Sequence, residues 1–128
     1  MARSLRRLLA AAALPVAAVA LAACGSEGIE LAQDDPNYEG AVLFSENCAM
    51  CHSLDVVGAY GSTTNVSSRE PRDGPNFNER SESVEDVLYA IENGGFSSGP
   101  MPQNIVTGED AQKVAEFVAR YSGGGPSE

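Results

Sequence analysis

Two cysteines and a histidine occur within five residues near the middle of the chain, in the order Cys48-Ala49-Met50-Cys51-His52. Two thiols separated by two residues can add to two vinyl groups of one porphyrin, and a histidine directly after them then lies under the metal. His52 is the only histidine in the sequence, so no other imidazole competes for that position. The pattern therefore predicts one covalently attached haem c, with His52 as an axial ligand of its iron.

Three other kinds of site could use the same residues. A zinc ion needs about four nitrogen, sulfur or oxygen ligands, and Cys48, Cys51 and His52 would need a carboxylate that the pattern does not identify. A thioredoxin-like redox pair is expected within a βαβ unit, and the sequence shows no confident strand on either side. A structural disulfide suits an exported protein but gives His52 no role. Haem attachment explains all three residues, and the other sites stay open as alternatives.

A methionine with a proline on each side follows further along the chain, at Pro100-Met101-Pro102. Proline cannot continue a helix, and it restricts the residue before it to extended backbone. We therefore expect Met101 on a rigid loop and not within a helix.

Three helices are expected to position these residues, over the ranges 36–47, 83–93 and 107–121. In the second and third ranges apolar residues recur at helical spacing and would form a buried stripe. Ser83 and Thr107 are the expected N-caps, because acidic residues follow each of them in the first turn.

The first expected helix contains a glycine that needs a physical reason. Pro36 suits its first turn, and Asp34 and Asp35 place negative charge at its N-terminal end. Gly40 and Phe44 are four residues apart and share one face. Glycine within a helix costs about 1 kcal/mol relative to alanine. We therefore interpret Gly40 as the point where another helix crosses at close range.

A long polar segment, residues 53–73, separates His52 from the second helix. It is rich in glycine, serine and threonine and shows no hydrophobic period, so it predicts a loop without confident strands. Residues 74–77, with the sequence Gly-Pro-Asn-Phe, then predict a turn.

The first 23 residues have the features of a bacterial export signal. Arginines without acids precede an apolar run from Leu8 to Ala23. The run ends in Leu21-Ala22-Ala23-Cys24. This end resembles the lipobox of bacterial lipoproteins, which implies cleavage before Cys24 and a lipid on its thiol. An ordinary signal peptide cut near Ala23, or a retained anchor shorter than the about 20 residues of a full membrane span, are the alternatives.

The remainder of the chain, residues 24–128, is strongly acidic. Of the eight basic residues three precede Leu8, which leaves five bases against 18 acids and a formal charge of −13. Nucleic acid is not expected as a partner of such a surface. The length allows one domain. We predict a flexible acidic tether at 24–35, one domain at 36–122 and a flexible tail at 123–128.

Taken together, these features resemble the class I c-type cytochromes of bacteria and mitochondria, over roughly residues 36–121. In that family a glycine and an aromatic residue lie eight and four residues before the first haem cysteine, as Gly40 and Phe44 do here. They pack across two positions of the C-terminal helix, which match Val114 and Phe117. The resemblance implies an all-α cytochrome c-like fold, with three main helices around one covalently bound haem.

The resemblance also implies two further roles at the haem. A Gly-Pro-Asn-Leu element follows the haem motif in the family, and the carbonyl of its proline accepts a hydrogen bond from the ligand imidazole. Pro75 would therefore orient His52 and tune its basicity. The family's distal methionine lies on a Met-Pro loop before the last helix, which makes Met101 the sixth ligand of the iron.

The implied function is electron transport by a carrier that is not itself an enzyme. With His52 and Met101 bound, the iron has no free position for a substrate and exchanges single electrons. The lipid anchor places the domain at the outer face of the bacterial cytoplasmic membrane. Its expected partners are redox proteins with a basic docking patch, such as an oxidase, a quinol-oxidising complex or a dehydrogenase of a respiratory chain, and we expect a monomer.

Two alternative functions remain. A haem enzyme or gas sensor would have an open sixth position at the iron, and Met101 would then be a packing residue. A fixed electron-transfer subunit of a dehydrogenase or oxidase complex would have the same haem site and differ only in its partner.

Overall fold

The computed structural model describes residues 28–62, 70–97 and 99–125. Its helices are α2 (Tyr38–Asn47), α3 (Val84–Asn93) and α4 (Gly108–Tyr121). Two short strands, β1 (Ser53–Leu54) and β2 (Ala59–Tyr60), enclose a 3-10 turn, η1 (Asp55–Val57), and a second such turn, η3 (Ser122–Gly124), follows α4. The all-α class that the sequence predicts is therefore confirmed, with very little strand in the described residues.

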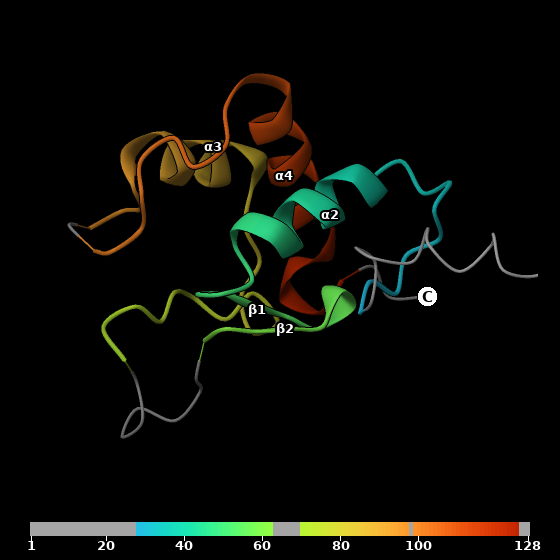
Figure 1. Ribbon diagram of the computed structural model, residues 1–128, viewed down its shortest axis with the longest axis horizontal. Helices are drawn as coiled ribbons and strands as arrows, with labels where there is room; N and C mark the ends of the chain where they lie inside the picture. Colours follow the sequence, from blue (N-terminus) through green and yellow to red (C-terminus); the bar gives the residue numbers. More distant parts are fainter. Residues whose placement is uncertain (1–27, 63–69, 98, 126–128) are drawn as a thin grey trace, which may run out of the picture.

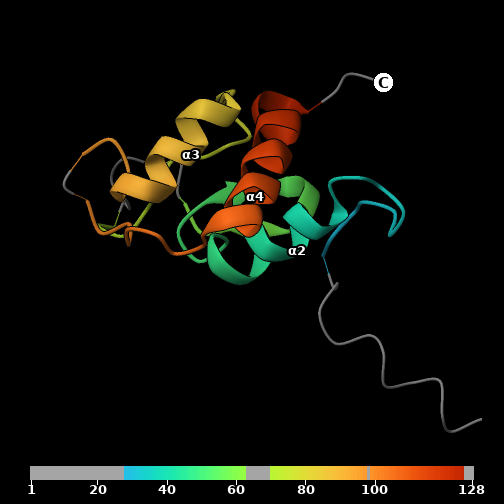
Figure 2. The same cartoon turned by 90° about the horizontal axis from the view of Figure 1, so that it is seen from above.

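The helix α4 lies between the other two helices and packs against both, as Figure 1 and Figure 2 show. It crosses α2 at Gly40, where an added Cβ atom would lie only 2.7 Å from the Cβ of Phe117. Phe44, one turn further along α2, is buried with its ring centroid 5.7 Å from that of Phe117. The predicted close crossing at Gly40 is confirmed, because any larger residue would push the two helices apart.

The helix ends follow the predicted signals with two differences. The Ser83 hydroxyl accepts a hydrogen bond from the Asp86 N–H at 3.1 Å, so Ser83 caps α3 as expected. Thr107 precedes α4 in extended backbone, but its side chain makes no capping bond. The helix α2 begins at Tyr38 and not at Pro36, because residues 35–37 form a turn in which the Asp35 carboxylate accepts a 2.7 Å bond from the Asn37 N–H.

The prediction of a loop without strands after His52 is wrong for residues 53–62. The strands β1 and β2 pair antiparallel, and the Gly58 backbone at φ +60° makes the turn that follows η1. Ser53 and Ser62 close the hairpin, because the Ser53 hydroxyl donates to the Ser62 carbonyl at 3.0 Å and accepts from the Ser62 N–H at 3.1 Å. Strands of two residues are too short to show an alternating pattern. Residues 63–69 of the expected loop lie outside the described residues.

Parts of the segments predicted as a flexible tether (24–35) and a flexible tail (123–128) pack on the domain. From residue 28 the chain packs on the domain, since Ile29 and Leu31 lie against the core and the Glu30 N–H donates to the Val56 carbonyl at 2.8 Å. At the other end the Gly123 N–H donates to the Phe77 carbonyl at 2.8 Å. Backbone hydrogen bonds and two apolar side chains therefore hold segments whose composition predicts flexibility.

The predicted export signal, the predicted lipid site Cys24 and residues 126–128 lie outside the described residues. Among the helices that the structure does describe, none combines the length and the apolar character needed to cross a bilayer.

Candidate haem site

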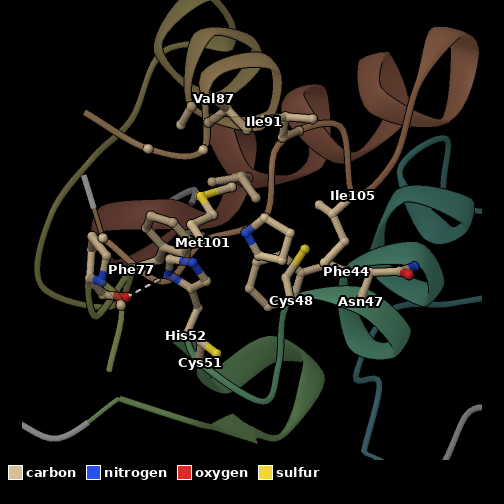
Figure 3. Close-up of a pocket in the computed structure, with 18 of the residues that line it drawn as sticks. Phe44, Asn47, Cys48, Cys51, His52, Phe77, Val87, Ile91, Met101 and Ile105 are labelled. Carbon is tan, nitrogen blue, oxygen red and sulfur yellow. Dashed lines mark hydrogen bonds between the residues drawn. The ribbon is translucent and has the colours of Figure 1, made fainter. Parts of the chain in front are cut away.

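A cavity of about 660 Å³ lies among the end of α2, the helix α3 and the loop that leads to α4 (Figure 3). Its wall is mainly apolar and includes Phe44, Val87, Ile91, Ile105, Val114 and Val118. The volume falls within the range of ~300–1,000 Å³ that is common for ligand and cofactor sites. The structure brings all the predicted haem-site residues of the domain to this one cavity, namely Cys48, Cys51, His52, Pro75 and Met101.

The backbone that carries the two cysteines continues the last turn of α2. The Cys48 N–H donates to the Phe44 carbonyl at 2.8 Å, and the Cys51 N–H donates to the Cys48 carbonyl at 3.1 Å. A second segment supports it, because the Gly74 N–H donates to the Cys51 carbonyl at 2.7 Å. Both thiols are free and half-buried. Two unpaired sulfur atoms are thus held at the wall of an apolar cavity.

The imidazole of His52 is buried and held in one orientation. The residue is only 9% exposed, and Nδ1 lies 3.1 Å from the Pro75 carbonyl oxygen. A carbonyl can only accept, so Nδ1 carries the proton and Nε2 keeps its lone pair. Burial lowers the pKa of His52, while the bond to Pro75 acts in the opposite direction. The ring is therefore neutral near pH 7, with Nε2 able to bind a metal.

Two neighbours fix the plane of this imidazole. The Phe77 ring stacks on it with centroids 4.7 Å apart and an angle of 9° between the planes. On Gly74 an added Cβ atom would lie 2.6 Å from Nδ1 of His52, far inside ordinary contact distance. The glycine and the aromatic residue of the Gly-Pro-Asn-Phe element therefore shape the pocket for the ring, in addition to the carbonyl of Pro75.

Met101 reaches the cavity from the loop between α3 and α4. Gly94 ends α3 with a left-handed backbone at φ +74°, and the Asn104 N–H donates to the Ile91 carbonyl at 2.7 Å. Met101 itself is half-buried and packs against the core. The structure thus places a thioether and the His52 imidazole at the same cavity (Figure 3).

Comparisons with known proteins agree with this arrangement. The sequence model of the family described as Cytochrome c matches residues 38–122. The chain belongs to the cytochrome c family. Among solved structures, the crystal structure of the c-type cytochrome SorU from Sinorhizobium meliloti is similar, with 32% sequence identity and a TM-score of 0.55, over 71% of this chain and 95% of that chain. No match was found among curated proteins.

The residues of this cytochrome c fit a covalently attached haem c. Burial, with a smaller contribution from Cys51, raises the pKa of Cys48 to about 12. Such a thiol stays protonated, unlike the acidic thiols of redox-active C-x-x-C pairs. In the described part of the chain no group of three or more His, Cys, Asp or Glu residues is arranged to hold a metal ion directly. Two free thiols, a neutral imidazole and an apolar cavity are the donor set and the surroundings that haem c requires.

Sequence reasoning missed several residues of this site. Arg72 and Arg80 are the basic residues among the described lining of the cavity, and Arg80 forms an ion pair with Glu82, whose side chain is only 7% exposed. The ring stacking of Phe77 was not foreseen either. The sequence did contain a signal for Arg80, because few basic residues follow the predicted export signal. Nothing in the spacing, however, links Arg80 to the C-x-x-C-H sequence.

Proposed function

We propose that this cytochrome c is a one-electron carrier of class I type, with one haem c per chain bound to Cys48 and Cys51. When bound, haem c supplies an iron that alternates between the ferric and ferrous states. His52 would bind this iron through Nε2 and Met101 through its sulfur. The proposal rests mainly on one observation, that the cavity with the two free thiols is also lined by the His52 imidazole and the Met101 thioether.

The residues around the iron support electron transfer more than catalysis. With both His52 and Met101 bound, the iron would keep no open position for a substrate. The bond from His52 Nδ1 to the Pro75 carbonyl makes the imidazole a stronger donor. A methionine ligand raises the reduction potential relative to other sixth ligands. Among the described residues, Arg72 and Arg80 line the cavity and could pair with the haem carboxylates, although they also form ion pairs with Glu70 and Glu82.

Maturation in a host that attaches haem c provides the test. In denaturing electrophoresis a haem peroxidase stain should move with the polypeptide, and the variant Cys48→Ala/Cys51→Ala should show no stain. Haem that acidic acetone extracts from the unmutated protein would disprove covalent attachment. An optical spectrum without a sulfur–iron band would favour an enzyme or a gas sensor with an open sixth position.

A lipid on Cys24 would keep this carrier at the outer face of the cytoplasmic membrane. The support is the sequence before Cys24, with a basic start, an apolar run and a lipobox-like end. Two acyl chains anchor a protein stably, whereas a single chain does so only marginally. The mature protein should therefore fractionate with membranes, and Cys24→Ala should prevent lipid attachment. A fully soluble wild-type protein that begins at another residue would contradict the anchor.

The redox partner is expected to present basic residues around an apolar contact surface, so that they face the acids of this domain. The helix α3, next to the cavity, carries Glu85, Asp86 and Glu92 at exposed positions and no basic residue. Opposite charges accelerate a brief encounter without making it tight. An oxidase, a quinol-oxidising complex or a dehydrogenase of a respiratory chain would meet this description, either as a separate partner or as a complex that holds this chain as a subunit. Co-purification from detergent distinguishes the two arrangements.

A further inference from the structure

We propose that Asn78 is a positioning residue, which holds the Pro75 carbonyl where His52 can donate to it. The inference rests on the proposed role of His52 as an iron ligand. Asn78 lies three residues after Pro75 and does not line the cavity, so it acts on the iron only through the backbone between them.

The side chain of Asn78 joins two segments that are 23 residues apart in sequence. Its Oδ1 accepts from the Asp55 N–H at 2.8 Å, and its Nδ2 donates to Asp55 Oδ1 at 3.0 Å. The same Nδ2 donates to Asn76 Oδ1 at 3.0 Å, and that oxygen also accepts from the Asn78 N–H at 3.0 Å. One amide therefore ties the end of the Gly-Pro-Asn-Phe turn to the start of η1.

These bonds belong to a short parallel pairing that begins at the imidazole. His52 Nδ1 and the Pro75 carbonyl meet at one end, 3.1 Å apart. In the middle the Phe77 N–H donates to the Ser53 carbonyl at 2.9 Å, and Ser53 and Asn76 form a parallel bridge. Asn78 and Asp55 close the other end. Residues 52–55 and 75–78 are thus fixed at both ends, which determines where the Pro75 carbonyl points.

Only an amide fits the three partners of the Asn78 side chain. Asp55 offers an N–H donor and a carboxylate acceptor, and Asn76 offers an acceptor, so the position needs one acceptor and two donors. The asparagine side chain has these groups, and both N–H bonds of its Nδ2 are used. A flipped amide would place Oδ1 against two acceptors. An aspartate would do the same and would add a like charge beside Asp55.

Loss of these bonds should weaken the bond between the Pro75 carbonyl and His52. A hydrogen-bonded Nδ1 makes the imidazole a stronger donor, which favours the ferric state. Asn78→Ala should therefore favour the ferrous state and should expose the Nδ1 proton to exchange with solvent. A side chain with only a structural role would change the melting temperature but neither of these two properties.

The test compares haem-loaded wild type, Asn78→Ala and a matched control, Asn93→Ala. Asn93 also donates through Nδ2, but to a backbone carbonyl, that of Tyr89 at 2.9 Å, at the exposed end of α3. At one fixed ambient potential the ferrous-to-ferric ratio of Asn78→Ala should rise about threefold, which is about 28 mV at ~59 mV per factor of ten. NMR should show at least tenfold faster exchange of the Nδ1 proton. Asn93→Ala should match the wild type in both measurements.

Two further variants, both with an aspartate at position 78, test the inference even if Asn78→Ala is unstable. Asn78→Asp should accelerate Nδ1 exchange, and the charge-conserving double variant Asp55→Asn/Asn78→Asp, which restores a donor opposite a carboxylate, should slow it again. Equal ratios and exchange rates in wild type and Asn78→Ala, or equal changes in Asn78→Ala and Asn93→Ala, would overturn the inference. Unmutated protein without haem, or without a histidine–iron bond, would instead overturn the proposed function and this inference with it.

Discussion

The two sides of the haem cavity are built differently. We call residues 48–62 and 74–78 the histidine wall, and residues 94–97 and 99–106 the methionine loop. The histidine wall is joined by hydrogen bonds between distant segments, such as Gly74 to Cys51 at 2.7 Å, and by the Phe77 ring stacked on His52. The described residues of the methionine loop make fewer such bonds, and its prolines Pro100 and Pro102 are exposed.

This difference indicates which of the two proposed iron ligands, His52 and Met101, is fixed and which can be exchanged. A ligand held by packing and hydrogen bonds on several sides returns to the same place after each electron transfer, which keeps reorganisation small. A ligand on a loop that is tied mainly near its ends, as by the bond from the Asn104 N–H to the Ile91 carbonyl at 2.7 Å, can move without disturbing the core. We therefore expect the bond between Met101 and the iron to be the weaker of the two.

The largest effect is expected from Gly74→Ala, which disrupts the packing of the histidine wall. The added methyl group would lie 2.6 Å from Nδ1 of His52, so either the imidazole or the turn must move. Overpacking of this kind costs about 1–3 kcal/mol of folding free energy, and here it would also displace His52, the proposed iron ligand. We expect little or no haem-stained protein after maturation.

The matched control is Gly99→Ala on the methionine loop. There an added Cβ atom would lie 3.8 Å from its nearest neighbour, the Ser97 hydroxyl oxygen, which is an ordinary contact. This variant should mature with normal yield and melting temperature. If the two alanine variants show the same yield of haem protein, the two sides do not differ in rigidity.

Met101→Ala is expected to have the second largest effect and should leave the protein folded. The ferric protein should lose its weak far-red sulfur–iron band, its reduction potential should fall, and small exogenous ligands should bind to the iron. Spectra, a redox titration and ligand titrations measure these changes. Unchanged spectra would make Met101 a packing residue, and a collapse of the fold would place the methionine loop in the rigid part of the molecule.

The sequence predicts helices better than it predicts the histidine wall. The apolar stripes of α3 and α4 repeat with the helical period, and Gly40 is costly enough to require an explanation, which the crossing with Phe117 provides. By contrast, β1 and β2 have two residues each, and no period can be recognised over so short a length. The hydrogen bond between His52 and Pro75 was expected only from the family resemblance, because nothing in the spacing of these two residues requires it.

Contacts between distant polar residues are the hardest to foresee. Asn78 and Asp55 are ordinary surface residue types, and the sequence contains many that could pair. The segment from Ile29 to Asp35 resembles a linker in composition, yet the Tyr121 hydroxyl donates to the Asp35 carboxylate at 3.1 Å. The hydrogen bond from the Asn37 N–H lowers the pKa of Asp35 most, and the bond from the Tyr121 hydroxyl lowers it further. These contacts depend on the tertiary fold and leave no periodic signal.

Ionic strength tests whether the acidic surface, which includes the exposed acids of α3, steers the redox partner. The exposed acids of α3 lie beside that loop, so a lysine-rich mitochondrial cytochrome c should be reduced more slowly as salt increases. The Debye length falls from about 30 Å at 0.01 M to about 10 Å at 0.1 M. We expect the rate constant to fall by roughly tenfold over this range. The anion ferricyanide should show the opposite trend, and a flat profile with both acceptors would exclude steering by the acidic surface.

Two exposed tyrosines, one on each side of the cavity, allow the smallest and most local test. Tyr89 on α3 is 50% exposed and stacks on Phe96 of the methionine loop, with ring centroids 5.1 Å apart. Tyr60 on β2, in the histidine wall, is 76% exposed. Phe96 is 64% exposed and also lines the cavity. Tyr89 and Phe96 therefore form an exposed apolar patch beside the haem cavity, next to the exposed acids of α3.

Truncation of most interface residues costs less than about 1 kcal/mol of binding, which is roughly fivefold, and tyrosine is enriched among the residues that cost more. At low salt Tyr89→Ser should therefore slow reduction of the lysine-rich acceptor by about two- to fivefold. The reduction potential of the variant and its rate with ferricyanide should stay unchanged. Tyr60→Ser should behave as the wild type with both acceptors, because the more exposed tyrosine lies away from the expected contact. An equal loss in both variants would show that electrons do not leave preferentially beside the methionine loop, and the opposite order would place the contact on the histidine wall.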